Sequence, residues 1–371
     1  MADQKIDVHA HFVTESYRQT LLDHGIDYPD GFPHIPTWSI QSHIDFMDSN
    51  GISKSIISIS SPGTNFTSDT TLNRAVTRET NDHAASIKQQ HPSRFGFFAS
   101  LPISDITASV TEIGYALDTL NADGFVLMSN TNHIYLGDPI LRPVLAELNA
   151  RGAIVFVHPT SACNHHSDKS YKENYAISSP LATVYPAPHF EFFFDSARSI
   201  LDLLNSSTVA RFPRIRWIVS HCGGVLPSLL DRMFMMLRLA STIESHESYF
   251  AQEQLKALVT NPADEAQGKE QMNGRDPIAV TEEEVRTALR EKFFFDLAGT
   301  PVPNQVEALL KFTTTGSLLF GSDVPFTPFE AAGVLVGEVE EGLPVAVGKE
   351  HVNAVYKDNA ERMLLGGLPE E

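Results

Sequence analysis

The sequence contains only two cysteines, Cys163 and Cys222, among its 371 residues. That is too few for a disulfide-stapled scaffold or a cysteine-rich zinc site, and it suits a reducing compartment. Apolar runs are short; Ala153–Val157 is typical, and it falls far below the length that crosses a bilayer. The start, Met1 to Asp7, lacks the apolar segment of a signal peptide, so we expect a cytoplasmic protein.

Basic side chains are also scarce: 27 lysines and arginines stand against 46 aspartates and glutamates, a formal net charge of −19. A chain this acidic repels phosphate backbones, so we expect neither a nucleic-acid nor a membrane partner. Histidine, in contrast, occurs 15 times. It is the commonest metal ligand and the acid–base group of neutral pH, so the search for chemistry starts from these residues.

Eight short β-rich runs follow one another along the chain, each apolar at nearly every position, as in strands buried on both faces of a parallel sheet. Helical stripes separate them; Val110, Ile113 and Leu117 form one. The alternation predicts a (β/α)₈ TIM barrel, and the absence of GxGxxG after the first run disfavours a doubly wound open sheet. The predicted strands are 5–12, 53–60, 94–102, 122–129, 152–159, 214–222, 293–299 and 316–323.

We expect a single barrel domain over residues 1–371. Two polar stretches, 161–180 and 241–285, look like insertions near the C-terminal mouth of the barrel without direct chemistry. The segment 348–365 is typical of an amphipathic helix, which would cap the barrel.

Histidines and one aspartate stand where the predicted strands end, which is where barrel enzymes place their chemistry. The first strand ends in His9-Ala10-His11, whose rings share one face about 6–7 Å apart because strand side chains alternate. His158, His221 and Asp323 end the fifth, sixth and eighth strands. These ends converge in a closed barrel, so we expect a metal site.

Three imidazoles and a carboxylate suit a borderline divalent ion, with Zn²⁺ favoured and Mn²⁺ as the alternative. We expect no organic cofactor. His133 and His189 lie in loops near the predicted mouth and are candidates for substrate contact. The aromatic run around Phe192 and Phe194 supplies candidate apolar walls of a pocket.

The His9-x-His11 pair, the VHP around His158, the SHCGG of His221 and the GSD of Asp323 resemble the amidohydrolase superfamily, within its decarboxylase branch. The similarity runs over most of the chain outside the two insertions, and it is greatest to the fungal 6-methylsalicylate decarboxylases of polyketide pathways. It implies a (β/α)₈ fold and a metal-dependent, non-oxidative carboxy-lyase. The expected reaction converts 6-methylsalicylate to 3-methylphenol and CO₂.

The resemblance implies that His9, His11, His158 and Asp323 bind one divalent metal and that His221 is catalytic. It also implies a homodimer in which Arg232 reaches the neighbouring subunit's active site; pairing of dimers into tetramers stays open. Binuclear relatives carry a lysine at the end of the fourth strand. No lysine occurs in the run 124–129, which favours a single metal.

Breaking an aryl–carboxylate bond requires protonation of the ring carbon, so that the departing CO₂ leaves its electrons to restore aromaticity. Asp323 is the first candidate for that proton donor, with His221 assisting. This role predicts a dry site that raises the pKa of Asp323. The alternative is a mononuclear metal-dependent hydrolase of a lactone or amide, in which His221 or Asp323 acts as the base.

Overall fold

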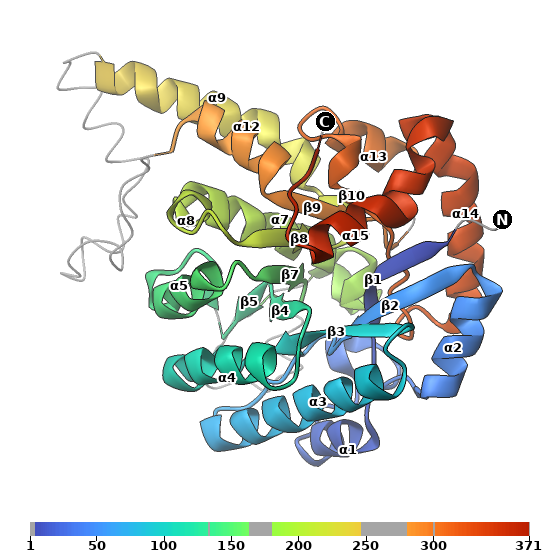
Figure 1. Ribbon diagram of the computed structural model, residues 1–371. Helices are drawn as coiled ribbons and strands as arrows, with labels where there is room; N and C mark the ends of the chain where they lie inside the picture. Colours follow the sequence, from blue (N-terminus) through green and yellow to red (C-terminus); the bar gives the residue numbers. More distant parts are fainter. Residues whose placement is uncertain (1–3, 133, 163–179, 246–279, 300, 371) are drawn as a thin grey trace.

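Eight parallel strands form a ring surrounded by helices, as the sequence predicts, in a computed structural model that describes residues 4–132, 134–162, 180–245, 280–299 and 301–370 (Figure 1). The backbone N–H of Val8 donates to the carbonyl of Phe320 at 3.0 Å and thereby joins the last strand to the first. The strands, in the order of their pairing, are β1 (Lys5–His11), β2 (Ile52–Ser58), β3 (Phe95–Ser100), β4 (Gly124–Met128), β7 (Ile154–His158), β8 (Arg216–Val219), β9 (Phe293–Asp296) and β10 (Leu318–Leu319).

Helices follow the strands and cover the outside of the ring (Figure 1). Several begin at side chains that cap free backbone N–H groups; Ser39 and Ser42, for example, form a reciprocal capping box at α2. The helices are α1 (Glu15–Asp23), α2 (Ile40–Ser49), α3 (Thr70–Gln90), α4 (Ile106–Asp118), α5 (Arg142–Ala150), α7 (Glu191–Asn205), α8 (Thr208–Arg211), α9 (Leu226–Ser245), α12 (Glu282–Glu291), α13 (Asn304–Leu309), α14 (Phe329–Val347) and α15 (Asn359–Leu364). Within these, no helix has the length and apolar character needed to cross a membrane.

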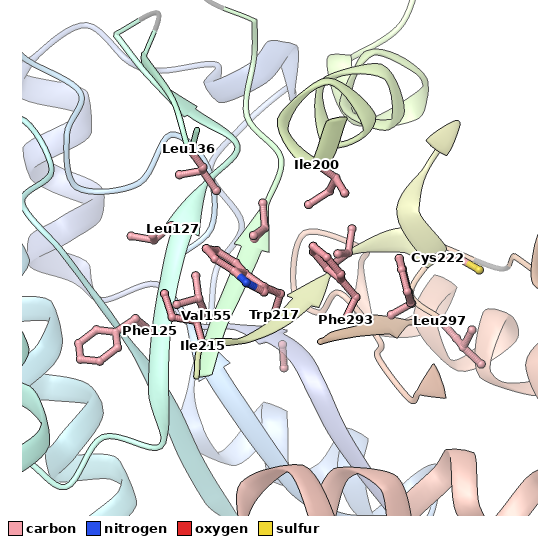
Figure 2. Packing of buried hydrophobic residues seen from close by; sticks show 14 of the residues in the cluster. Phe125, Leu127, Leu136, Val155, Ile200, Ile215, Trp217, Cys222, Phe293 and Leu297 are labelled. Carbon is pink, nitrogen blue, oxygen red and sulfur yellow. The ribbon is translucent and has the colours of Figure 1, made fainter. Parts of the chain in front are cut away.

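Alternate residues of a regular strand pack on opposite sides of the sheet, as the pleat requires. In β9, Phe294 belongs to the cluster inside the barrel, whereas Phe293 and Phe295 belong to the outer cluster beneath the helices. Figure 2 shows this outer layer, where Trp217 and Phe293 lie below Ile200 of α7. Two apolar layers therefore hold the strand ends in a rigid frame.

An irregularity in β1 decides where its histidines point. Ile6 and Val8 belong to the interior cluster, so strict alternation would send His9 and His11 to the outside. Between Asp7 and Ala10, however, β1 advances three residues while β2 advances two, from Ser55 to Ile57. This bulge shifts the alternation by one residue and turns both rings inward.

The C-terminal segment closes the end of the barrel opposite the histidines. The predicted helix over 348–365 is present, but the structure divides it into η8 (Lys349–His351), a π-helical turn (Ala354–Asp358) and α15. Ala360 and Met363 of α15 complete the interior cluster, so this segment caps the barrel as expected.

The two predicted insertions lie mostly outside the described residues, at 163–179 and 246–279. Their described borders correct the expectation, because α9 continues to Ser245 and α12 already begins at Glu282. The structure also contains a short antiparallel hairpin that the sequence did not predict, formed by β5 (Asn130–Thr131) and β6 (Ile134–Tyr135).

Truncation of an interior ring tests the inner layer. Phe294 is completely buried, so Phe294→Ala should lower the free energy of unfolding by about 3–5 kcal/mol, measured by guanidinium denaturation. Leu365→Ala, at a position that is 88% exposed, is the control and should change it by less than about 0.5 kcal/mol. Equal losses in the two variants would contradict the packing described above.

Candidate metal centre and active-site pocket

Three imidazoles and one carboxylate meet at the mouth of the barrel. His9 and His11 come from β1, His158 ends β7, and Asp323 follows β10. Their ligand atoms all lie within 4.8 Å of one another. Oδ1 of Asp323 lies 3.4 Å from Nε2 of His9 and 3.2 Å from Nε2 of His11. The four side chains expected from the sequence are therefore brought together.

Each ring is oriented through its other nitrogen. Nδ1 of His11 lies 3.3 Å from the carbonyl oxygen of Ser58, and Nδ1 of His158 lies 2.7 Å from that of Pro159. Because a carbonyl can only accept, Nδ1 of His158 carries the proton, and its Nε2 is the nitrogen with a lone pair. Nδ1 of His11 also lies 3.2 Å from Oγ of Ser58, and Nε2 of both rings belongs to the cluster at the centre.

The site also passes a test of whether a cation fits. Nε2 of His9 and Nε2 of His11 are buried and have no hydrogen-bond partner in the described part of the chain. Leaving such atoms without a partner is costly. A divalent cation held by three imidazoles and one carboxylate would satisfy them, and this donor set suits Zn²⁺ or Mn²⁺.

Asp296 connects His9 to the backbone of His221 beneath the cluster, and no sequence motif marks it as a site residue. Its Oδ2 lies 3.0 Å from Nδ1 of His9, and its Oδ1 accepts from the backbone N–H groups of His221 at 3.1 Å and Ala298 at 3.0 Å. The available signal was its position, a lone carboxylate at the end of the apolar seventh strand. Asp296 ties β1 to β9 and to the turn that carries His221.

The charges of the cluster are strongly coupled. Burial disfavours a charged His9, but Asp296 and Asp323 outweigh it and raise the pKa of His9 to about 10. Burial likewise raises the pKa of Asp323, yet the charge of His9 and the close approach of the His11 and His9 imidazoles hold the pKa of Asp323 well below its usual range. The raised pKa expected for Asp323 is therefore wrong, because the histidines that form the metal site also stabilise its ionised form.

The turn after β10 places Asp323 over the histidines. Asp323 has φ 62°, in the left-handed region, and its N–H donates to the carbonyl of His9 at 2.7 Å. Ser322 donates from Oγ to buried Asp7 at 2.6 Å and fastens this turn to β1. A Cβ at Gly321 would lie 2.8 Å from Cβ of His9, so only glycine allows this approach.

His221 stands beside the cluster and faces the pocket. Its ring centroid lies 4.8 Å from that of His9, and its Nδ1 lies 3.3 Å from the carbonyl oxygen of Ala298. Burial lowers the pKa of His221, with the charge of His9 adding to the effect. The ring is therefore neutral, and Nε2 is its accepting nitrogen.

A small pocket opens above the cluster. His158, His221, Asp323 and Phe192 line it as the sequence predicts. Arg232, His189 and Phe194 are exposed and are not among its lining residues, and His133 lies outside the described residues. The other lining residues are Asp30, Phe32, Ser60, Pro188 and Phe326. The pocket thus joins a metal-binding floor to aromatic walls.

Comparisons with known proteins find relatives that match most of the chain. The amidohydrolase family profile matches residues 6–365. The chain is 33% identical to the 6-methylsalicylic acid decarboxylase of Penicillium expansum over 330 residues, 88% of this chain and 86% of the relative. It is 32% identical to the 6-methylsalicylic acid decarboxylase acuB of Aspergillus aculeatus over 362 residues, 96% of this chain and 94% of the relative.

Among solved structures, the dihydroxybenzoic acid decarboxylase of Polaromonas sp. JS666, with bound manganese and the inhibitor 2-nitroresorcinol, has the same fold. Its TM-score is 0.72 at 19% identity, over 98% of this chain and 97% of that one.

The role of Asp296 can be tested through metal affinity. We expect the wild-type protein to bind about one Zn²⁺ or Mn²⁺ per chain. Asp296→Asn should weaken metal binding by about 10–100-fold, because the neutral amide replaces the charged carboxylate that accepts the hydrogen bond from His9. Calorimetric titration of the metal-free protein measures the affinity. Asp118→Asn removes an exposed carboxylate and should bind like the wild type; an unchanged affinity in Asp296→Asn would contradict the orienting role.

Proposed function

We propose that this chain, which belongs to the amidohydrolase family, is a metal-dependent, non-oxidative decarboxylase that converts 6-methylsalicylate to 3-methylphenol and CO₂. The observation that carries the proposal is the cluster of His9, His11, His158 and Asp323 at the floor of an aromatic pocket. No lysine or arginine is among the described residues that line the pocket, which suits a small acid with one carboxylate. The two fungal relatives bear the name of the same reaction.

His9, His11, His158 and Asp323 would hold the cation, either Zn²⁺ or Mn²⁺. When bound, a divalent cation polarises the carboxylate and neighbouring hydroxyl of the acid and orients the ring. Phe192 and Phe326 line the pocket and exclude water from the ring. His221 lines the pocket beside Asp323, and its Nε2 accepts from the substrate hydroxyl and orients it until that proton passes to Asp323.

Asp323 moves the proton in this proposal. Since the histidines keep it ionised, Asp323 first takes the proton of the substrate hydroxyl. It then delivers that proton to the ring carbon that bears the carboxylate. The carbon–carbon bond breaks, its electrons restore aromaticity and CO₂ leaves. The remaining phenolate takes a proton from solvent, and Asp323 is ionised again.

The exposed face of α9 supports a homodimer. Leu229, Met236 and Leu239 are 38%, 36% and 45% exposed, and they recur at helical spacing beside exposed Arg232. A second copy of this chain would cover the stripe and bring Arg232 to the neighbouring pocket, where its charge would meet the acid.

Product analysis tests the reaction. We expect CO₂ and 3-methylphenol from 6-methylsalicylate, with salicylate and 2,6-dihydroxybenzoate assayed beside it. No CO₂ from any acid, with metal bound, would overturn the proposal, and a hydrolysed lactone or amide would support the alternative.

Asp323→Asn tests the proton path. The amide cannot carry a proton to carbon, so kcat should fall by about 10²–10⁴-fold or more. Metal content and thermal stability, measured on the same preparation, separate loss of chemistry from loss of metal or fold. Near-normal turnover would remove Asp323 from the mechanism.

Complementation tests the role of Arg232. Arg232→Ala and Asp323→Asn should each be nearly inactive as homodimers. If Arg232 serves the neighbouring pocket, a mixed dimer of the two variants contains one intact site and regains activity. A mixed dimer as inactive as its parents would assign Arg232 to its own subunit or to the surface.

A further inference from the structure

A buried carboxylate in the pocket has no part in the proposed reaction. Asp30, in the short turn η1 (Pro29–Gly31) between α1 and α2, lines the pocket and is only 2% exposed. It is not a member of either group of side chains that could hold a metal among the described residues. The aromatic rings of Phe32 and Phe326, whose centroids lie 5.9 Å apart, line the same pocket.

The position of Asp30 is set by its neighbours. Ser161 donates from Oγ to Oδ1 of Asp30 at 2.5 Å, and a side-chain hydrogen bond from Ser61 also acts on this carboxylate. Asp30 itself has φ 54°, a left-handed conformation that aspartate tolerates better than most residues. The carboxylate is therefore held in place before any ligand enters.

A hydrogen-bonded chain continues from these serines to the helix that carries Phe192. Ser61 shares a hydrogen bond of 2.6 Å with Thr160, whose N–H donates to Oγ of Ser129 at 3.1 Å. Ser129 donates in turn to Asp195, which is buried in α7. Asp30 and Phe192 are thus placed by one network and form parts of a single built pocket.

The Asp30 carboxyl group can hydrogen-bond to a ligand in its ionised form and in its protonated form. Burial raises the pKa of Asp30, whereas the hydrogen bonds from Ser161 and Ser61 lower it. A carboxylate offers about four acceptor positions, so it can bind the serines and still accept from a ligand. A protonated carboxyl group could also hydrogen-bond to a hydroxyl. A ring without a hydroxyl at this position would displace water from the Asp30 carboxyl group and offer it no hydrogen-bond partner in return, which is unfavourable.

We propose that Asp30 is a specificity-determining residue that hydrogen-bonds to a second ring hydroxyl of the aromatic acid, beyond the hydroxyl next to the carboxylate. This inference rests on the proposed function in taking an aromatic acid as the ligand, and it refines the substrate class. The pocket binds suitably placed dihydroxylated acids more tightly than monohydroxylated ones, because a site that can bond a hydroxyl favours ligands that carry it. 6-Methylsalicylate, which has one hydroxyl, is then accepted as a substrate without being the tightest ligand.

Equilibrium binding tests this selectivity without requiring turnover. Calorimetry on the Mn²⁺-loaded protein compares salicylate with 2,3-, 2,4-, 2,5- and 2,6-dihydroxybenzoate, each of which adds one hydroxyl. We expect at least one isomer to bind the wild type about tenfold more tightly than salicylate does. In Asp30→Asn that advantage should shrink to about twofold or less, while salicylate binding changes little.

Asp27→Asn is the matched control, since Asp27 is an exposed carboxylate on the same loop. It should keep the wild-type preference. If Asp30→Asn fails to fold, Ser161→Ala replaces it: this variant loses the hydrogen bond that orients Asp30, and the preference should narrow in the same direction.

Two results would overturn the proposal. One is a wild type that binds no dihydroxylated isomer more tightly than salicylate. The other is a uniform loss for all five acids in Asp30→Asn, or in Ser161→Ala if that variant is used, because a merely structural residue would weaken every ligand alike. CO₂ release, measured separately with the same acids, reports on the proposed reaction, so failure of the reaction is distinguishable from failure of the selectivity.

Discussion

The hydrogen bond between His9 and Asp296 is the contact on which the candidate site depends. It crosses the buried mouth of the barrel from β1 to β9, and both side chains are completely buried. The bond directs Nε2 of His9 at the metal-binding position, while the other oxygen of Asp296 holds the backbone that leads to His221. A single carboxylate therefore places a candidate metal ligand, His9, and a pocket residue, His221, relative to each other, which explains why it is buried in spite of the desolvation cost.

The same charges that prepare the site for a cation shape its chemistry. Asp296 and Asp323 lie on two sides of His9 and together favour a positive charge between them, which a proton or a divalent cation can supply. Asp323 is consequently ionised rather than kept as a neutral acid. In the proposed reaction the proton would therefore come from the substrate, and Asp323 would carry it between two substrate atoms.

Above this polar floor, the pocket is built from two kinds of wall. Phe32, Phe192 and Phe326 supply apolar surface, whereas Asp30 adds one polar group supported by its own hydrogen-bonded network. A small number of polar groups in an apolar pocket orients a ligand sharply. Each polar group that the ligand leaves without a hydrogen-bond partner costs binding free energy. Loops in a barrel enzyme can vary such groups without disturbing the strands, since the two apolar layers already hold the strand ends.

The eight strands and the convergence of His9, His11, His158, His221 and Asp323 could be predicted from the sequence, because strand composition and strand-end position are local properties. The sequence did not reveal Asp296 as a partner of His9, nor Asp30 as part of the pocket, since the residues they contact are 287 and 131 positions away in the chain. It also did not show that the inward direction of His9 and His11 needs a bulge, because strand alternation alone says only that both rings share one face. The closed ring of strands determines which face the two rings share. It also determines the charge state of Asp323, because only the closed ring brings this carboxylate next to the histidines.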